Sequence, residues 1–248
     1  MPDEYAIDAR AFARTLVEQR RMQLKGGLYH LNQVQMAYNS NRIEGSRLSE
    51  EQTRAIYETR AVDGHALVDD IVETTNHFRL FDTMLDAVGQ PLTADRIKQY
   101  HRILKSGTSD SDKTWFVVGG WKQLPNTVGD IRTTPPDQVA NAVDALLAQY
   151  HDRLLTFDDV CDFHVALETI HPFQDGNGRV GRIVLFEQCL ANGIMPFVIT
   201  DDEKLFYYRG LAQYPTQPGF LRETFRHFQD EYYSQYHEYV PRESGDGS

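Results

Sequence analysis

The chain has 248 residues, of which 41% are hydrophobic and 25% are charged, a composition typical of one globular domain with a sizeable core. The formal net charge of −11 at pH 7 argues against binding of nucleic acid through the overall field, because phosphate neutralisation needs a basic face. No apolar run approaches the roughly 20 residues of a membrane helix, and the first ten residues lack the layout of a signal peptide. We therefore expect a cytoplasmic protein that binds neither nucleic acid nor a membrane.

A helical hydrophobic period runs through most of the chain. The first clear stripe predicts a helix that Gly89 can terminate, and it carries Leu67, Ile71, Phe78, Leu85 and Val88. A second helix can begin at Thr93, a residue suited to capping, and it carries Ile97, His101 and Leu104. A third begins at about Pro136 and carries Val139, Val143, Leu146 and Tyr150.

A helix, loop, helix unit is predicted between residues 156 and 193. Thr156 and Asp159 have the spacing of a capping box, and an apolar face of Val160, Phe163, Leu167 and Ile170 follows. His171 precedes a proline, so it is pushed out of the α region and is predicted to stand at the helix end. The following segment, Arg179 to Leu190, is apolar enough to be a central buried helix that ends at Asn192 and Gly193.

Strand character is confined to Thr114 to Arg132, where Trp115 to Val118 precedes two glycines and a short hairpin is expected. The predicted fold is therefore all-α with one hairpin. Cys161 and Cys189 fall on apolar helical faces and are expected to be free and buried. The last apolar stripe is expected to be core or a self-association face in a homodimer, and it comprises Leu221, Phe225, Phe228, Tyr232, Tyr236 and Tyr239.

The segment from His171 to Arg182 has the residue types of an anion site. Gly176 and Gly178 allow a tight turn at a helix start, where free N–H groups and the helix dipole attract phosphates. Arg179 and Arg182, one turn apart on the same helix, could hold further phosphate oxygens.

The same segment also carries a base and a hard oxygen ligand. Asp175 could hold Mg²⁺ beside phosphates, since that ion is usually bound by one or two carboxylates and several waters. His171 could accept a proton at neutral pH from an attacking hydroxyl. Each residue alone is more often structural, but their occurrence within twelve positions favours nucleotide chemistry.

This segment resembles the Fic family signature, His-x-Phe-x-Asp/Glu-Gly-Asn-Gly-Arg-x-x-Arg, at every position, and the similarity extends over roughly Ser40 to Phe228. The resemblance implies a Fic fold, a helical bundle with a short β-hairpin flap beside the active-site loop. It also implies N-terminal helices with an inhibitory helix (1–48) and a Fic core with flap and C-terminal helices (49–240). A polar tail (241–248) is predicted to be disordered.

The resemblance implies a protein adenylyltransferase, which moves AMP from ATP to a hydroxyl side chain of a target protein or of itself. His171 would deprotonate that hydroxyl and Asp175 would hold Mg²⁺. The remaining phosphate-binding residues implied are Gly176, Asn177, Gly178, Arg179 and Arg182. The implied nucleotide contacts elsewhere are the flap residues Val128, Gly129, Asp130 and Ile131, which would also pair with an extended target segment, and the adenine-flanking Tyr207 and Tyr208.

Two positions depart from the family pattern. Lys122 stands in the flap where the family usually has arginine, and lysine cannot reproduce a planar bidentate contact. Pro215 stands where an asparagine near the adenine is common. Target preference and base recognition are therefore less well specified than phosphate binding.

A second motif, Ser40-Asn41-Arg42-Ile43-Glu44-Gly45, resembles the family's inhibitory signature. Glu44 is expected to pair with Arg182 in the place of the γ-phosphate, and Ser40 is expected to orient Glu44. Alone, the motif also fits an exposed glutamate before a glycine cap.

Other functions fit the same residues. Fic-like folds with an altered loop transfer phosphate or other phosphate-linked groups, although the intact Gly-Asn-Gly favours AMP. The site could also remove AMP, with Glu44 aligning a water molecule. A module that only binds nucleotide would be expected to have a catalytic residue replaced, and none of the signature positions is replaced in this chain.

Overall fold

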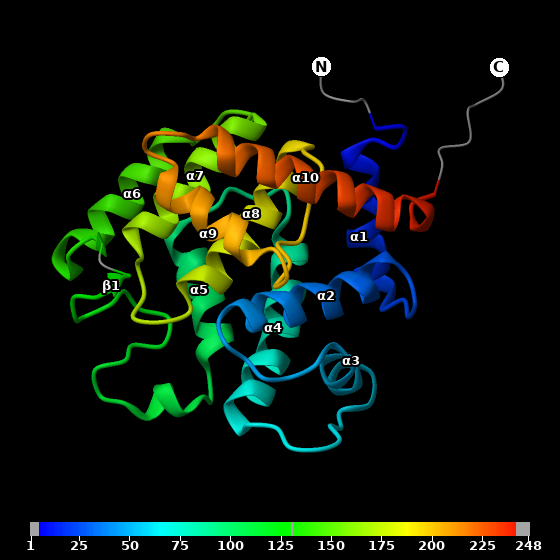
Figure 1. Cartoon of the computed structure of the whole chain (residues 1–248), viewed down its shortest axis with the longest axis horizontal. Coiled ribbons are helices and arrows are strands. Elements are labelled where there is room, and N and C mark those ends of the chain that lie inside the picture. Colours follow the sequence, from blue (N-terminus) through cyan, green and yellow to red (C-terminus); the bar gives the residue numbers. More distant parts are fainter. Residues whose placement is uncertain (1–4, 130, 242–248) are drawn as a thin grey trace.

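The structure is a computed structural model, which describes residues 5–129 and 131–241 and is almost entirely helical (Figure 1). The α-helices are α1 (Ala9–Met22), α2 (Leu28–Ile43), α3 (Glu50–Thr59), α4 (Val68–Ala87), α5 (Ala94–Lys105), α6 (Val139–Gln149), α7 (Phe157–Ile170), α8 (Asn177–Asn192), α9 (Lys204–Gln213) and α10 (Gly219–Tyr236). Short 3₁₀ turns lie at η1 (Ser109–Asp112), η2 (Pro136–Gln138) and η3 (His237–Tyr239). Within the described ranges, no helix combines the length and apolar character that crossing a membrane requires.

Helix α8 lies at the centre of the bundle, where α1, α2, α4, α5 and α7 pack around it (Figure 1). A helix can be enclosed in this way only when apolar side chains point in most directions. Helix α8 meets this condition through Val180, Ile183, Val184, Leu185, Phe186, Cys189 and Leu190, all of which are buried. The prediction of a central buried helix is confirmed, and the helix begins two residues earlier than expected, at Asn177.

The capping residues predicted from the sequence act as caps. Thr93 accepts a hydrogen bond from the backbone N–H of Arg96 at the start of α5. Thr156 and Asp159 form a reciprocal capping box at the start of α7. Because each cap satisfies backbone N–H groups that the helix leaves free, these helices have fixed starting points.

The hairpin is shorter than the strand-like sequence suggested. Strands β1 (Thr127–Val128) and β2 (Ile131–Arg132) pair antiparallel, with Thr127 opposite Arg132. The prediction of strand character for Trp115 to Val118 is wrong, because Trp115 and Val118 lie in turns and none of these residues belongs to a strand. The apolar run instead places the Phe116 ring, which is 6% exposed, beside His101 of α5.

The C-terminal apolar stripe belongs to the core. Leu221, Phe225, Phe228, Tyr232 and Tyr236 are all buried, whereas Tyr239 is exposed. Both cysteines are free and buried, as expected. Pro241 is the last described residue, so the rest of the predicted disordered tail lies outside the described residues.

Helix α2 is buried on its polar as well as its apolar side. Its buried polar residues include Asn32, Gln33 and Asn39. Gln33 donates to Asp82 of α4 at 2.6 Å, and Asn32 accepts from the Tyr232 hydroxyl of α10 at 2.8 Å. Because buried amides are costly unless they are hydrogen-bonded, these bonds fix the position of the first half of α2.

Close packing of α9 on α10 generates a prediction about stability. A Cβ atom at Gly210 would lie 3.0 Å from the Cα of Leu221, a backbone atom that cannot move aside easily. We expect Gly210→Ala to lower the free energy of unfolding by about 1–3 kcal/mol through overpacking. Gly219→Ala is the matched control, because nothing lies within 4 Å of the position of its Cβ. Equal unfolding midpoints in urea for the two variants would contradict this packing.

Candidate active site

The His171–Arg182 segment folds as the predicted helix, loop, helix unit. Helix α7 ends at Ile170, and His171 caps it in the left-handed conformation with φ of 51°. Gly176, with φ of 81°, precedes the first turn of α8 and offers no side-chain cap. The backbone N–H groups of that turn therefore remain available to an anion, in the field of the helix dipole.

The surroundings of His171 favour its neutral imidazole form. Burial lowers its pKa below the usual value, and the positive charge of Lys122 lowers it further. A left-handed backbone is uncommon for a residue other than glycine, and such local strain is typical of functional positions. At neutral pH the ring can accept a proton.

The loop between the two helices is braced from its inner side. The Asn177 side chain accepts from the Phe173 N–H at 2.7 Å and donates to the Phe173 carbonyl at 2.9 Å. The buried Phe173 ring stacks on His101 with centroids 4.0 Å apart and planes 2° apart. Both polar atoms of Asn177 are thus engaged within the loop, and this residue supports the predicted phosphate cradle by fixing its backbone.

His101 connects the loop to α5 and to the segment before the flap. Its Nδ1 accepts from the Gly119 N–H at 2.9 Å, so its Nε2 carries the hydrogen and donates to the Asp175 carbonyl at 3.1 Å. Burial lowers the pKa of His101 to about 3, which keeps the ring neutral. The sequence placed His101 on an apolar stripe and gave no sign of this role.

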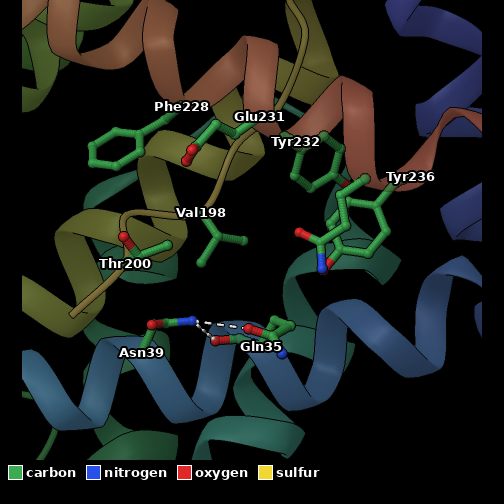
Figure 2. Close-up of a pocket in the computed structure, with 9 residues that line it drawn as sticks. Gln35, Asn39, Val198, Thr200, Phe228, Glu231, Tyr232 and Tyr236 are labelled. Atoms are coloured by element: carbon green, nitrogen blue, oxygen red, sulfur yellow. Dashed lines mark hydrogen bonds between the residues drawn. The ribbon is translucent and has the colours of Figure 1, made fainter. Parts of the chain in front are cut away.

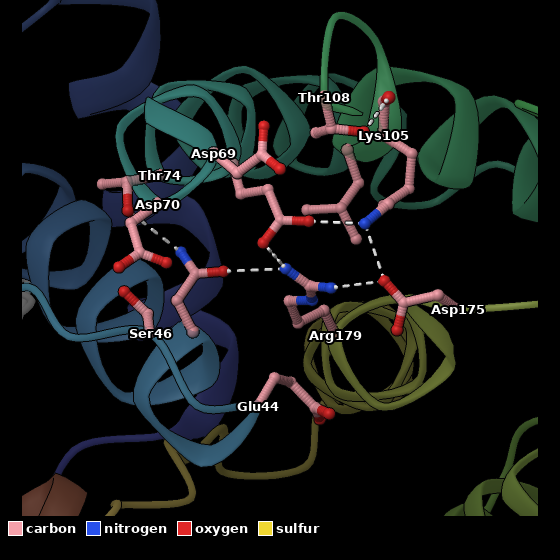
Figure 3. A network of polar contacts seen from close by, with 12 residues as sticks. Glu44, Ser46, Asp69, Asp70, Thr74, Lys105, Thr108, Asp175 and Arg179 are labelled. Carbon is pink, nitrogen blue, oxygen red and sulfur yellow. Dashed lines mark hydrogen bonds and ion pairs between the residues drawn. The ribbon is translucent and has the colours of Figure 1, made fainter. Parts of the chain in front are cut away.

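An ion network surrounds Asp175 and Arg179 (Figure 3). Asp175 Oδ2 lies 2.6 Å from Lys105 Nζ and 3.2 Å from Arg179. Glu73 of α4 bridges the same two cations, 2.6 Å from Lys105 and in direct contact with Arg179. Burial alone would raise the pKa of Asp175, but the charges of Arg179 and Lys105 outweigh it and hold that pKa at about 2. Lys105 and Glu73 have no place in the signature motif, so the sequence did not identify them.

Glu44 and Arg182 meet although 138 positions separate them. Glu44 Oε1 lies 2.7 Å from the Arg182 guanidinium, which is also held by the Ser40 hydroxyl and the Ser40 carbonyl, each at 2.9 Å. Ser40 was expected to orient Glu44, but its hydroxyl contacts Arg182. A Cβ atom at Gly178 would lie 2.3 Å from Glu44 Oε1, so the carboxylate rests against the first turn of α8.

The two predicted adenine-flanking tyrosines differ in exposure. Tyr207 is 1% exposed and its hydroxyl lies 2.9 Å from His164 Nε2, so it has no face to offer a base in this structure. Tyr208 is 42% exposed and lies beside the end of α2, 3.4 Å from the Ile43 carbonyl. Of the two rings, Tyr208 is the exposed one, and the adenine contacts of both stay a prediction.

The flap lies beside the loop. Val128 is half exposed and Gly129, with φ of 56°, forms the turn of the hairpin. Ile131 belongs to β2, and Asp130 lies outside the described residues.

Lys122 ties the flap to the loop. Its Nζ donates to Asn126 at 2.8 Å and to Thr133 at 2.6 Å, both at the base of the hairpin, and its backbone N–H donates to the Pro172 carbonyl at 2.9 Å. Burial lowers the pKa of Lys122 to about 8. Lys122 is 4% exposed, so it makes these hydrogen bonds in the interior of the protein.

Comparison with known proteins finds similarity to one family. Residues 91–189, which include the whole signature segment and exclude α2, match the model of the Fic/DOC family. This part of the chain is similar to a Fic domain. The Fic fold is also seen in a Fic domain-containing signaling protein from Bacteroides thetaiotaomicron, with a TM-score of 0.72 and 21% identity over 90% of this chain and 94% of that one. Fic-1 from Caenorhabditis elegans gives a TM-score of 0.67 at 21% identity, over 94% of this chain and 72% of that one.

Curated relatives of this chain are named protein adenylyltransferases. The Nematostella vectensis protein is 26% identical over 186 residues, which cover 72% of this chain and 42% of that protein. The Drosophila erecta protein is 28% identical over 198 residues, which cover 71% of this chain and 36% of that protein. The chain therefore spans well under half the length of the curated relatives that it matches.

The position of Lys122 in the candidate site leads to a prediction about His171. Lys122 carries its charge throughout the pH range in which His171 titrates, because its own pKa is about 8. Its removal should therefore raise the pKa of His171, since a neighbouring cation disfavours imidazolium. NMR titration of the His171 ring in wild type and Lys122→Met measures this difference. The exposed Lys25→Met is the control, and an unchanged His171 pKa in Lys122→Met would refute the electrostatic link.

Proposed function

We propose that this chain is a protein adenylyltransferase that uses ATP and Mg²⁺ to attach AMP to a hydroxyl side chain of a target protein. The observation that carries the proposal is a neutral imidazole at His171 beside an uncapped helix start and two buried guanidiniums, Arg179 and Arg182. The names of the curated relatives agree with this chemistry.

In the proposed reaction the target hydroxyl oxygen attacks the α-phosphorus of ATP while its proton passes to His171. The bond from the α-phosphorus to the bridging β-oxygen breaks, and pyrophosphate leaves with that electron pair. The first turn of α8 and the side chains of Arg179 and Arg182 bind the phosphates and hold them in line. Such transfers depend mainly on alignment and charge neutralisation.

The residues around Asp175 fit a magnesium ion. The carboxylate is ionised, since its pKa is about 2, and its side chain is 47% exposed. Lys105 and Arg179 both contact Oδ2 of this carboxylate. Asp175 would hold the ion through a carboxylate oxygen, and the ion would neutralise phosphate charge.

The target would lie along the flap. Strand β1 has one partner, β2, among the described residues, and Val128 is half exposed. An extended target segment could therefore add as a further strand, with affinity from main-chain pairing. Self-modification would use the same route, with a second copy as target.

Glu44 would inhibit the enzyme by occupying Arg182. The carboxylate and the γ-phosphate are both anions that need the same guanidinium, and only one can hold it. Arg182 also donates hydrogen bonds from its Nε and one terminal nitrogen to Ser40. These bonds do not depend on Glu44, so the guanidinium would remain positioned for phosphate after the carboxylate leaves.

Removal of the proton acceptor should abolish transfer. In a Glu44→Gly background, where transfer is expected to be fast, we expect His171→Ala to lower AMP transfer by about 10²–10⁴-fold with ATP still bound. The assay follows label from α-³²P-ATP and from γ-³²P-ATP onto protein, and nucleotide binding is measured separately. The exposed His151→Ala is the control. Near-normal transfer by His171→Ala would exclude the catalytic role, and label from γ-³²P-ATP would indicate phosphate transfer instead.

Removal of the inhibitory carboxylate should raise transfer. We expect Glu44→Gly to increase AMP transfer, self-modification included, by about tenfold or more, because a hydrogen bond between charged groups contributes roughly 1.5–3 kcal/mol. Glu44→Gln keeps the bulk and removes the charge, so partial activation would show that charge contributes. Glu44→Gly with Arg182→Ala should lose the gain. If wild type is already as fast as Glu44→Gly, Glu44 does not inhibit and the segment is an ordinary helix end.

A further inference from the structure

Three potential metal ligands converge away from the signature segment, where α9 begins against α10. Glu203 stands at the N-cap position of α9. His227 and Glu231 lie on successive turns of α10, four residues apart and therefore on one face. Within the described ranges, this is the one group of three or more His, Cys, Asp or Glu residues with all ligand atoms within 4.8 Å of one another.

The distances between the ligand atoms suit a small tetrahedral ion. His227 Nε2 lies 3.3 Å from Glu203 Oε1 and 3.5 Å from Glu231 Oε1. Two ligands bound tetrahedrally to zinc at about 2.0–2.1 Å are about 3.3–3.4 Å apart. The two distances from His227 therefore match zinc geometry, and all three ligand atoms lie within 4.8 Å of one another.

The chemistry and exposure of the three side chains also suit a transition metal. One imidazole and two carboxylates form a ligand set that zinc accepts, and magnesium prefers an all-oxygen environment. The His227 and Glu231 side chains are 52% and 53% exposed, so a water molecule can reach a fourth position. Glu203 Oε2 is buried without a hydrogen-bond partner among the described residues, which leaves part of that negative charge uncompensated.

We propose that Glu203, His227 and Glu231 bind one divalent transition-metal ion of the zinc type. The competing explanation is direct pairing of His227 with the two carboxylates, which accounts for the same contacts without a metal. The two explanations differ in whether the chain binds zinc at this place.

A metal here would join two segments next to α2. Glu231 also lines a cavity of about 40 Å³ between α10 and α2, opposite Gln35 and Asn39 (Figure 2). On the other segment, two residues before Glu203, the Asp201 N–H donates to Asn39 at 3.0 Å. The ion would therefore link the start of α9 to α10, and both of these segments contact α2. Such a link should raise the thermal stability of the protein.

The test uses the full, untagged chain after treatment with a chelator. Zn²⁺ affinity is measured by competition with a chromophoric chelator, and Co²⁺ is added to record its visible absorption spectrum. We expect one Zn²⁺ per chain, at least a tenfold loss of affinity in His227→Ala and Glu203→Gln, and a Co²⁺ spectrum that those variants lack. Zn²⁺ should raise the melting temperature of wild type more than that of His227→Ala.

Two controls separate this site from general metal binding. His151→Ala removes another exposed histidine beside a carboxylate, 2.8 Å from Asp152, and should bind Zn²⁺ as wild type does. Circular dichroism confirms that His227→Ala and Glu203→Gln remain folded. Equal Zn²⁺ affinity in wild type and His227→Ala, or no binding by wild type, would overturn the proposal and leave an ion pair at this place. Because these residues lie outside the proposed phosphate and base positions, that result would not affect the proposed transfer activity.

Discussion

The arrangement of the site depends on the burial of two guanidiniums at the start of α8. Arg179 and Arg182 are each 3% exposed, and a buried charge is stable only when it is paired and hydrogen-bonded. The chain supplies these anions itself. Glu73 and Asp175 form ion pairs with Arg179, and Glu44 forms an ion pair with Arg182. The elements that carry these carboxylates, α2, α4 and the loop, are thereby held around one end of α8.

The rigidity of α2 decides how Glu44 could leave. The first half of the helix is anchored by the bonds of Gln33 to α4 and of Asn32 to α10, while Glu44 itself stands just past the last helical residue. The Glu44 side chain is 29% exposed, in contrast to the buried Arg182. Exchange of the carboxylate for a phosphate would thus require movement at the end of α2 rather than displacement of the whole helix.

Most of the fold and much of the site could be predicted because their signals are local. The capping box of Thr156 and Asp159 and the turn at Gly176 each lie within a few residues, so their geometry follows from backbone preferences. Pairing of Glu44 with Arg182 could be predicted from the family resemblance of two motifs.

What the sequence did not show depends on contacts between distant segments. Lys105 looks like a charged residue at a helix end, and only the fold encloses it among Glu73, Asp110 and Asp175. The depth of Tyr207 could not be read from its spacing either, since helical periodicity gives a direction but not a distance from the surface. The apolar run at Trp115 to Val118 has the residue types of a strand, but only Phe116 of this run is buried and no strand forms there.

Gly178 limits how the proposed inhibition could be lost through mutation. The space that a methyl group would fill at this position is the space that Glu44 Oε1 now occupies, 2.3 Å from where the Cβ would stand. A larger residue there would expel the carboxylate, but it would also stand in the first turn of α8, where the phosphates are proposed to bind. Single substitutions at this contact that relieve the proposed inhibition and preserve the proposed phosphate site are therefore confined to the α2 side. Constitutively active forms, if they arise, should carry changes near Glu44 and retain glycine at position 178.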